Sequence, residues 1–292
     1  MEDMKNIQWF PGHMAKTRRL IKSNLSLVDA VVEILDARTP LSSRNPEMDR
    51  LVAGKPRMAI LNKADLADER ATEKWLAYFR KQNITAISAD CKTGRGLKNF
   101  IPTVKTQVLK SLVEKYEKLG INGKPIRLMI VGIPNVGKSS FINKIAGTKK
   151  AKAEDRPGVT RNKQWVKISS GVEMLDMPGV LWPKFEDQQV ACRLAFTGAV
   201  KDDILDIETL ASKLLKFLAE NYPENLRERY KIDFDENDEG YTLLEKTGRK
   251  RGMLISGGEV NTERMAVTVL DEYRGGKIGK ITLELPEDES NE

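Results

Sequence analysis

A glycine-bounded loop near the middle of the chain has the composition of a phosphate-binding loop. Residues 132–139 read GIPNVGKS, which fits GxxxxGK[ST] between an apolar run and a helical stretch. Gly132 and Gly137 let the backbone curl so that its amides face phosphate oxygens, and the positive end of the following helix adds to this attraction. We expect Lys138 to reach the β- and γ-phosphates and the Ser139 hydroxyl to bind Mg²⁺. The phosphate contacts are expected from Asn135, Val136, Gly137, Lys138, Ser139 and Ser140.

Two downstream features have residue types that could sense the γ-phosphate. Residues 176–179 read DMPG after another apolar run, where Asp176 can hold Mg²⁺ through water and the Gly179 amide can contact the γ-phosphate. Thr160 lies between the two motifs, and its hydroxyl is expected to complete the Mg²⁺ coordination only when the γ-phosphate is present. A plain β-turn and a surface threonine are the alternatives. On the functional interpretation, Lys138, Thr160 and Gly179 contribute to hydrolysis.

A third motif, upstream of the phosphate loop, could read a purine base. Residues 62–65 read NKAD at the end of an apolar run. The carboxylate of Asp65 can accept hydrogen bonds from guanine N1–H and the 2-amino group, which adenine does not offer. Asn62 can brace the loop, and the aliphatic stem of Lys63 can cover the base. Ser88 and Ala89 end the next run, where a backbone amide could meet guanine O6. Together these motifs predict specificity for GTP and GDP.

The order of the motifs differs from that of familiar GTPases, in which the phosphate loop comes first. Here NKAD and SA precede GIPNVGKS, Thr160 and DMPG. The same sheet can still form if the usual termini are joined and the chain is opened elsewhere, so we predict a circularly permuted GTPase. The joining segment is expected at residues 109–125.

The elements that position these motifs alternate between short apolar runs and helical stretches. This alternation predicts an α/β fold: a mostly parallel six-stranded sheet covered by helices on both faces, in a permuted Ras-like domain. The expected strands are residues 30–36, 58–62, 84–88, 127–132, 164–168 and 171–176, and the expected helices are residues 46–53, 68–81, 97–118 and 138–146.

Beyond residue 184 the pattern becomes helical, with amphipathic stretches at 188–200, 207–221 and 262–273 and one strand signal at 280–285. We therefore divide the chain into a GTPase domain at residues 1–184, with an N-terminal arm at 1–20, and a smaller α-helical domain at 185–292. The switch that follows Asp176 would run directly into this second domain, and we expect it to couple hydrolysis to the helices.

Composition favours a cytoplasmic protein with an acidic partner. Lys and Arg outnumber Asp and Glu by 49 to 42, which is compatible with nucleic acid but does not by itself indicate it. No apolar run approaches the roughly 20 residues that span a bilayer, so no membrane contact is expected. Cys91 and Cys192 form no metal-ligand spacing and are expected to be reduced thiols.

Outside the nucleotide motifs the chain contains WFPGHM at residues 9–14, DAR at 36–38, SSRNP at 42–46, and KRGML and SGG at 250–254 and 256–258. With the permuted motif order, these segments resemble the ribosome biogenesis GTPase A family (the YlqF/RbgA group) over nearly the whole chain. The resemblance implies a factor for late assembly of the large ribosomal subunit, and a helical C-terminal domain that touches ribosomal RNA. It further implies a partner consisting of rRNA and ribosomal proteins. We expect a monomer.

The resemblance also bears on catalysis. Ras-like enzymes place a glutamine after DxxG to orient the attacking water, but here Val180 follows and cannot hydrogen-bond to water. His13 is the only histidine of the chain, and the family carries a proposed catalytic histidine at this position. A surface or capping histidine is the alternative. Asn135 matches an asparagine that helps related GTPases hold K⁺.

Three basic clusters are candidates for contacts to RNA phosphates, although each could be an ordinary solvated face. They comprise Lys16, Arg18, Arg19 and Lys22; Lys149, Lys150 and Lys152; and Lys246, Arg249, Lys250 and Arg251. Two other functions remain open on the sequence alone: an RNA-binding scaffold with a structural nucleotide, and an ATP-dependent small-molecule kinase, which NKAD disfavours.

Overall fold

The computed structural model describes residues 12–52, 54–147, 164–168, 171–179, 187–235 and 237–286, with the side chains of residues 12–17 and 204 excluded. Its centre is a six-stranded sheet in the order β3-β2-β1-β4-β6-β5. All neighbouring pairs are parallel except β5 and β6, which are antiparallel. The predicted mostly parallel six-stranded sheet is confirmed. Its strands are β1 (Ala30–Asp36), β2 (Arg57–Asn62), β3 (Thr85–Ser88), β4 (Ile126–Val131), β5 (Gln164–Ile168) and β6 (Val172–Asp176).

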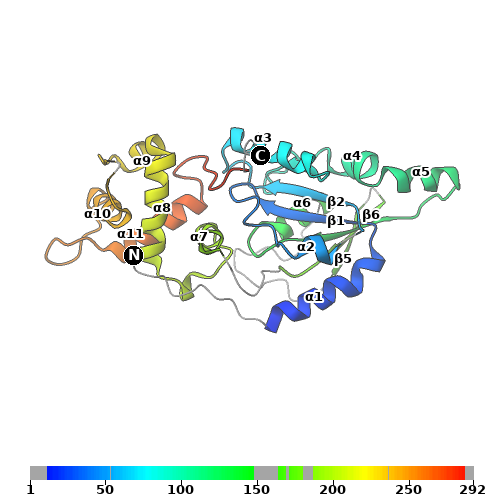
Figure 1. Cartoon of the computed structure of the whole chain (residues 1–292), viewed down its shortest axis with the longest axis horizontal. Helices are drawn as coiled ribbons and strands as arrows, with labels where there is room; N and C mark the ends of the chain where they lie inside the picture. Colours follow the sequence, from blue (N-terminus) through cyan, green and yellow to red (C-terminus); the bar gives the residue numbers. More distant parts are fainter. Residues whose placement is uncertain are drawn as a thin grey trace, which may run out of the picture. The chain divides into compact units, whose positions relative to one another are not determined.

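The strand order places the motifs at one edge of the sheet. The central strand β1 is buried along its full length, since parallel strands are covered on both faces. β2 lies beside β1 with Asn62 opposite Asp36, and β6 lies beside β4 with Asp176 opposite Ile130. The carboxyl ends of parallel strands meet at the same edge, so the segments that follow β1, β2, β4 and β6 gather there (Figure 1).

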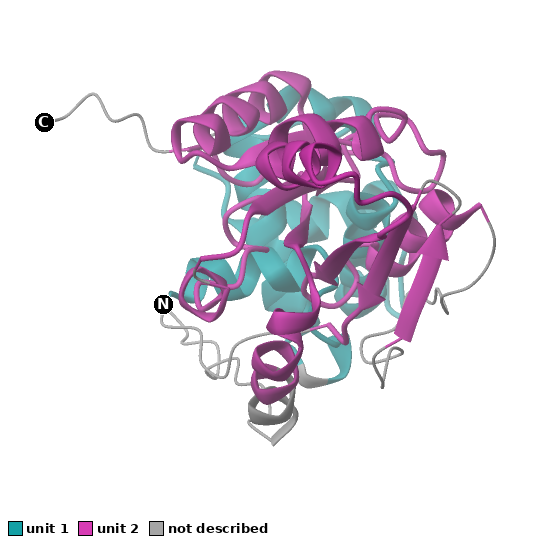
Figure 2. Ribbon diagram, turned by 90° about the vertical axis from the view of Figure 1, so that its right-hand side faces the viewer, with its two compact units in different colours: residues 1–7, 185–281 teal, residues 8–184, 282–292 magenta. Residues whose placement is uncertain are grey.

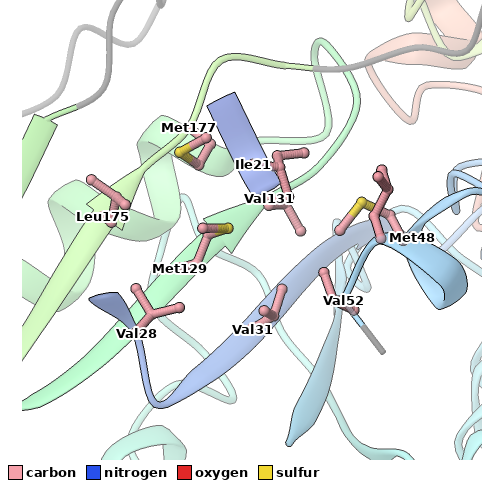
Figure 3. Close-up of a cluster of buried hydrophobic side chains, with 10 residues drawn as sticks. Ile21, Val28, Val31, Met48, Val52, Met129, Val131, Leu175 and Met177 are labelled. Carbon is pink, nitrogen blue, oxygen red and sulfur yellow. The ribbon is translucent and has the colours of Figure 1, made fainter. Parts of the chain in front are cut away.

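Helices cover both faces of this sheet. The relevant elements are α1 (Gly12–Asn24), α2 (Met48–Leu51), α3 (Glu69–Lys81), α4 (Phe100–Thr103), α5 (Lys110–Lys118) and α6 (Lys138–Ala146). On one face, Ile21 of α1 and Met48 of α2 pack against Val31, Met129 and Val131 of the strands (Figure 3). These fully buried side chains remove apolar surface from water and so hold the helices on the sheet.

The core continues under α3 on the same side of the sheet, where Trp75 and Phe79 pack against Leu35, Ala59 and Leu61. On the other side, Phe100 of α4 and Phe141 of α6 meet edge to face with ring centroids 5.0 Å apart. Such an edge-to-face pair adds to the stability from burial. The sheet is therefore a rigid support for the loops at its carboxyl edge.

The expected helix at 97–118 is wrong as a single element. It divides into α4, a π-helical turn at Val104–Val108, and α5. Leu109, at φ −118° and ψ 24°, leaves the helical region and separates the π-helical turn from α5. The expected strand at 280–285 is also absent: the Leu283 amide bonds to the Arg38 carbonyl, in the loop after β1, rather than to a strand.

The chain divides into two compact units, shown in different colours in Figure 2. The sheet unit comprises residues 8–184 and 282–292, and the helical unit comprises residues 1–7 and 185–281. Residues 282–292 were expected in the helical domain, but they belong to the sheet unit. The remainder of the predicted domain division stays a prediction.

The helical unit packs five helices around a leucine-rich core. They are α7 (Gln188–Phe196), α8 (Ile207–Asn221), α9 (Pro223–Tyr230), α10 (Gly240–Lys250) and α11 (Thr262–Arg274). Leu210, Leu214 and Leu218 of α8 are fully buried at helical spacing. No helix among the described residues is long and apolar enough to cross a membrane.

Candidate nucleotide-binding site

The phosphate loop joins β4 to α6 and has the backbone geometry that the glycines predict. Gly137 has φ +90° and is the N-cap of α6, so Lys138 opens the helix. A Cβ atom on Gly137 would lie 2.2 Å from the side-chain nitrogen of Asn62, and one on Gly132 would lie 2.7 Å from the carbonyl oxygen of Ile34. Both positions therefore exclude a side chain, and α6 directs its positive end at the loop.

Lys138 and Asp176 meet inside this site. The Lys138 ammonium lies 2.5 Å from a carboxylate oxygen of Asp176, and both side chains are almost fully buried. Each of these two buried charged side chains therefore has an opposite charge beside it. A phosphate group entering the loop would offer Lys138 competing oxygens and would release Asp176 toward a metal ion.

The oxygen donors of Ser139 and Asp176 fit Mg²⁺. This ion prefers hydroxyl, carboxylate and water oxygens and usually takes only one or two protein ligands beside phosphate and water. Asp176 is buried with a cationic partner already beside it, which is a suitable environment for exchanging one positive charge for another. The described residues contain no cluster of three or more His, Cys, Asp or Glu for an all-protein metal site.

The DMPG segment lies against the phosphate loop. A Cβ on Gly179 would approach the backbone nitrogen of Pro134 at 3.1 Å, so the two loops are in contact. Thr160, Val180 and the side chain of His13 lie outside the described residues, and their expected roles remain predictions. The structure thus brings together three of the expected groups: Lys138, Asp176 and Gly179.

Asn62 joins the base-reading loop to the phosphate loop. Its side-chain amide donates to the Val136 carbonyl at 2.6 Å, and its side-chain oxygen accepts from the Cys91 amide at 2.9 Å. The Asn62 side chain is buried, so both bonds are shielded from water. Segments 74 residues apart in the chain are therefore held together at the same edge of the sheet.

Lys63 is held by an ion pair that sequence reasoning did not identify. Its backbone has φ +61°, and its ammonium lies 3.1 Å from Asp36. Burial alone would raise the pKa of Asp36, but the guanidinium of Arg38 and the ammonium of Lys63 outweigh it and hold that pKa well below its usual range. The only sequence signal for this ion pair was the position of Asp36 and Arg38 at the end of an apolar run. Asp65 follows in the same loop and is half-buried.

The second base-reading segment has a different hydrogen-bond pattern from the one expected. The Ala89 amide donates to the Leu61 carbonyl at 2.9 Å, and the Ala89 carbonyl accepts from the Ala64 amide at 3.1 Å. The Ala89 amide is therefore used within the sheet, which fixes the NKAD loop against the end of β3. The expected bond from this segment to guanine O6 remains a prediction.

The chain is similar to known GTPases. Residues 127–248 match the family model described as "50S ribosome-binding GTPase". The chain is 48% identical over 285 residues to "Ribosome biogenesis GTPase A" of Bacillus cereus, covering 97% of this chain and 95% of the relative. It is 32% identical to the protein of the same name from Thermotoga maritima, with 97% and 95% covered.

Two solved structures resemble the whole chain. The "GDP-bound" structure of TM YlqF superposes with a TM-score of 0.66 at 29% identity and covers 92% of this chain and all of that one. The "GNP-bound" YlqF from T. maritima has a TM-score of 0.61 at 30% identity, with 94% and 99% covered. Both titles name a bound nucleotide.

Proposed function

The chain belongs to the ribosome biogenesis GTPase A family, and from this membership we propose that it binds the immature large ribosomal subunit and promotes its late assembly. In this proposal GTP hydrolysis to GDP and phosphate is a release or checkpoint step. GTP hydrolysis itself and the permuted GTPase fold follow from the family. The observation that carries the proposal is the near full-length similarity to relatives named for ribosome biogenesis, together with the family description that specifies the 50S particle.

In the proposed cycle, this chain's residues bind and orient the nucleotide. Asp65 accepts hydrogen bonds from guanine, Lys138 neutralises the β- and γ-phosphates, and the loop amides after Gly132 contact phosphate oxygens. Ser139, Thr160 and Asp176 would hold Mg²⁺, which would supply electrostatic stabilisation of charge on the phosphates. The Gly179 backbone lies against Pro134 of the phosphate loop, which supports the proposal that it responds to the γ-phosphate.

We assign the water-orienting role to His13, since Val180 occupies the place of the usual glutamine. An imidazole can accept a proton from water near neutral pH. His13→Ala should leave GTP affinity unchanged and lower the turnover that large subunits stimulate. A wild-type stimulated rate in that variant would remove His13 from the mechanism.

The helical unit supplies one proposed RNA-binding surface, at the C-terminal end of α10. Arg249 and Lys250 are exposed there, whereas Lys246 pairs with Asp238 at 2.6 Å and Arg251 pairs with Glu272 at 3.2 Å. We therefore expect Arg249 and Lys250 to contribute most to phosphate contacts within this cluster. Of the α1 cluster, Arg18 pairs with Glu47, and Arg19 and Lys22 are exposed. Residues 149–152 lie outside the described residues.

Further parts of the proposal concern conditions and assembly. Asn135 has φ +62° in the phosphate loop, and we propose it as the residue that helps hold K⁺ near the phosphates. The chain acts as a monomer in the cytoplasm on this proposal. Replacing K⁺ by Na⁺ in the hydrolysis assay tests the cation.

Co-sedimentation with immature large subunits tests the main proposal. Binding should be stronger with a non-hydrolysable GTP analogue than with GDP, and it should weaken steeply as salt rises, since phosphate contacts release counterions. The Arg249→Ala, Lys250→Ala double variant should weaken binding, with Lys277→Ala as an exposed basic control. The proposal would be contradicted if the protein sedimented with large subunits equally in GDP and in the analogue. It would also be contradicted if the protein showed no preference for large subunits.

A further inference from the structure

Residues 282–284 belong to the sheet unit, although they follow the helical unit in the chain. They lie in the part of the chain assigned to the sheet unit, and Thr282, Leu283 and Glu284 are all buried. The Leu283 amide donates to the Arg38 carbonyl at 2.8 Å, and the Trp75 indole donates to the Glu284 carbonyl at 3.0 Å. This segment, drawn at the red end of the colour scale in Figure 1, is called the return segment below.

The Glu284 carboxylate occupies a pocket of backbone donors after β1. One of its oxygens accepts from the amides of Leu41 at 2.6 Å and Ser42 at 2.8 Å. Its other oxygen accepts from the Ser42 hydroxyl. Charge-assisted bonds to buried amides are among the stronger hydrogen bonds in proteins, so Glu284 fixes the conformation of the loop that follows Asp36 and Arg38.

A chain of contacts leads from the return segment to Lys63. The Leu283 amide holds the backbone of Arg38, and the Arg38 guanidinium donates to both carboxylate oxygens of Asp36 at 2.9 and 2.8 Å. Asp36 in turn lies 3.1 Å from the Lys63 ammonium. The loop of Asp36 is further fixed by the Ser43 hydroxyl, which accepts from the Asp36 amide at 2.9 Å.

A second contact reaches the other side of the base-reading loop. The Thr282 hydroxyl accepts from the Asp68 amide at 3.1 Å. Asp68 caps α3 by accepting from the Ala71 amide at 2.8 Å, and it lies three residues after Asp65. The return segment thus contacts Arg38, which supports Lys63 through Asp36, and it also contacts Asp68, which caps α3.

We propose that the return segment is a positioning element for guanine recognition. Thr282 and Glu284 do not touch the base; they hold the supports of Lys63 and Asp65, so that the Asp65 carboxylate meets both N1–H and the 2-amino group. The chain leaves the sheet unit after residue 184 and re-enters it at this segment. The inference depends on guanine-nucleotide binding but not on the ribosomal role, because the test uses the isolated chain.

Comparing GDP with IDP isolates the positioning role. IDP lacks the 2-amino group, so the ratio of the two dissociation constants measures how well Asp65 is placed, whereas a general loss of folding weakens both ligands alike. Glu284→Ala should weaken GDP about tenfold and lower the GDP preference at least about threefold. Glu284→Gln keeps an acceptor oxygen for the two amides and should restore most of the preference. Glu228→Ala, an exposed carboxylate on α9, is the control.

Thr282→Val keeps the shape of the side chain and removes the hydroxyl that accepts from the Asp68 amide. This variant decides the question by the same ratio if Glu284→Ala does not fold, as judged by urea unfolding without nucleotide. A reduced GDP preference in either folded variant supports the proposal. An unchanged GDP preference in every variant that folds overturns the proposal. This holds whether the affinities for GDP and IDP are unaltered or fall equally, since the segment would then only stabilise the fold.

Discussion

Replacing Asn62 tests the connection between the two halves of the nucleotide site. The Asn62→Ala variant leaves the Cys91 amide and the Val136 carbonyl without their partner, and both residues are buried. An unsatisfied buried polar group costs about 1–3 kcal/mol. The two losses together lower the free energy of unfolding by about 2–6 kcal/mol. The phosphate loop and the NKAD loop also lose their shared support, so GDP affinity should fall by about tenfold or more.

A second substitution separates the two bonds. Asn62→Asp keeps an acceptor for the Cys91 amide but places a carboxylate oxygen against the Val136 carbonyl, where the amide nitrogen lay at 2.6 Å. This variant should therefore lose GDP affinity through the phosphate loop while it retains the contact to the segment after β3. The matched control is Asn99→Ala, since Asn99 is exposed and makes no side-chain cap on α4.

The assays are fluorescence titration with a labelled GDP and urea unfolding without nucleotide. The reasoning is refuted if Asn62→Ala binds GDP within twofold of wild type, because the bridge would then make no contribution to the site. Asn99→Ala should match wild type in both assays.

Three further results are expected. Asp65→Asn should lose affinity for GDP and gain affinity for xanthine nucleotides, because its amide can donate to the 2-oxo group that replaces the guanine amine. Competition binding measures both affinities. If wild type binds ATP as well as it binds GTP, the assignment of Asp65 is wrong. Lys138→Ala should abolish hydrolysis. Without nucleotide, this variant should also lower the free energy of unfolding by about 3–5 kcal/mol, because the buried Asp176 charge loses its partner. The double variant with Asp176→Ala should recover part of this stability, and no recovery would argue against the ion pair. The lowered pKa of Asp36 stabilises the fold fully at pH values above the unfolded pKa of about 3.9, and this stabilisation is lost as pH falls toward the folded value. In urea unfolding, wild type should therefore lose more stability than Asp36→Asn from about pH 5 downward. Parallel curves of stability against pH for the two proteins would exclude the ion pair as the cause.

The strands of the sheet were predictable because buried parallel strands appear in a sequence as short apolar runs. The run at 30–36 matches β1 at both ends, and the run at 164–168 matches β5. The phosphate loop was predictable from two glycines that no other residue type could replace at those contacts. Local chemistry specified both features, so no knowledge of distant residues was needed.

Helices with little burial were harder to predict. α9 buries only Leu226 and Tyr230, which is too few for a periodic signal, although Pro223 at its first turn is a typical helix start. α10 contains Gly248, a poor helix former that is required because a Cβ there would lie 2.3 Å from Val260. In α10, tertiary packing therefore decided against local propensity.

The contacts that hold the site were not predictable where they depend on distant partners. Apolar alternation at 280–285 predicted a strand that the structure does not contain, and it could not reveal that the partners of this segment are the Arg38 carbonyl and the Leu41 and Ser42 amides. The Asp36–Lys63 ion pair likewise depends on the register between β1 and β2. Sequence patterns specify which face of an element is buried but not which group lies opposite.

The return of residues 282–284 to the sheet unit has a consequence for biosynthesis. Translation proceeds from the N-terminus, so every helix between residues 185 and 281 is synthesised before Glu284 exists. A nascent chain can pair its strands and form its phosphate loop while the donors at Leu41 and Ser42 still lack their carboxylate. The nucleotide domain of a newly made molecule is therefore finished only after its helical portion has been translated, which ties the maturation of one unit to the production of the other.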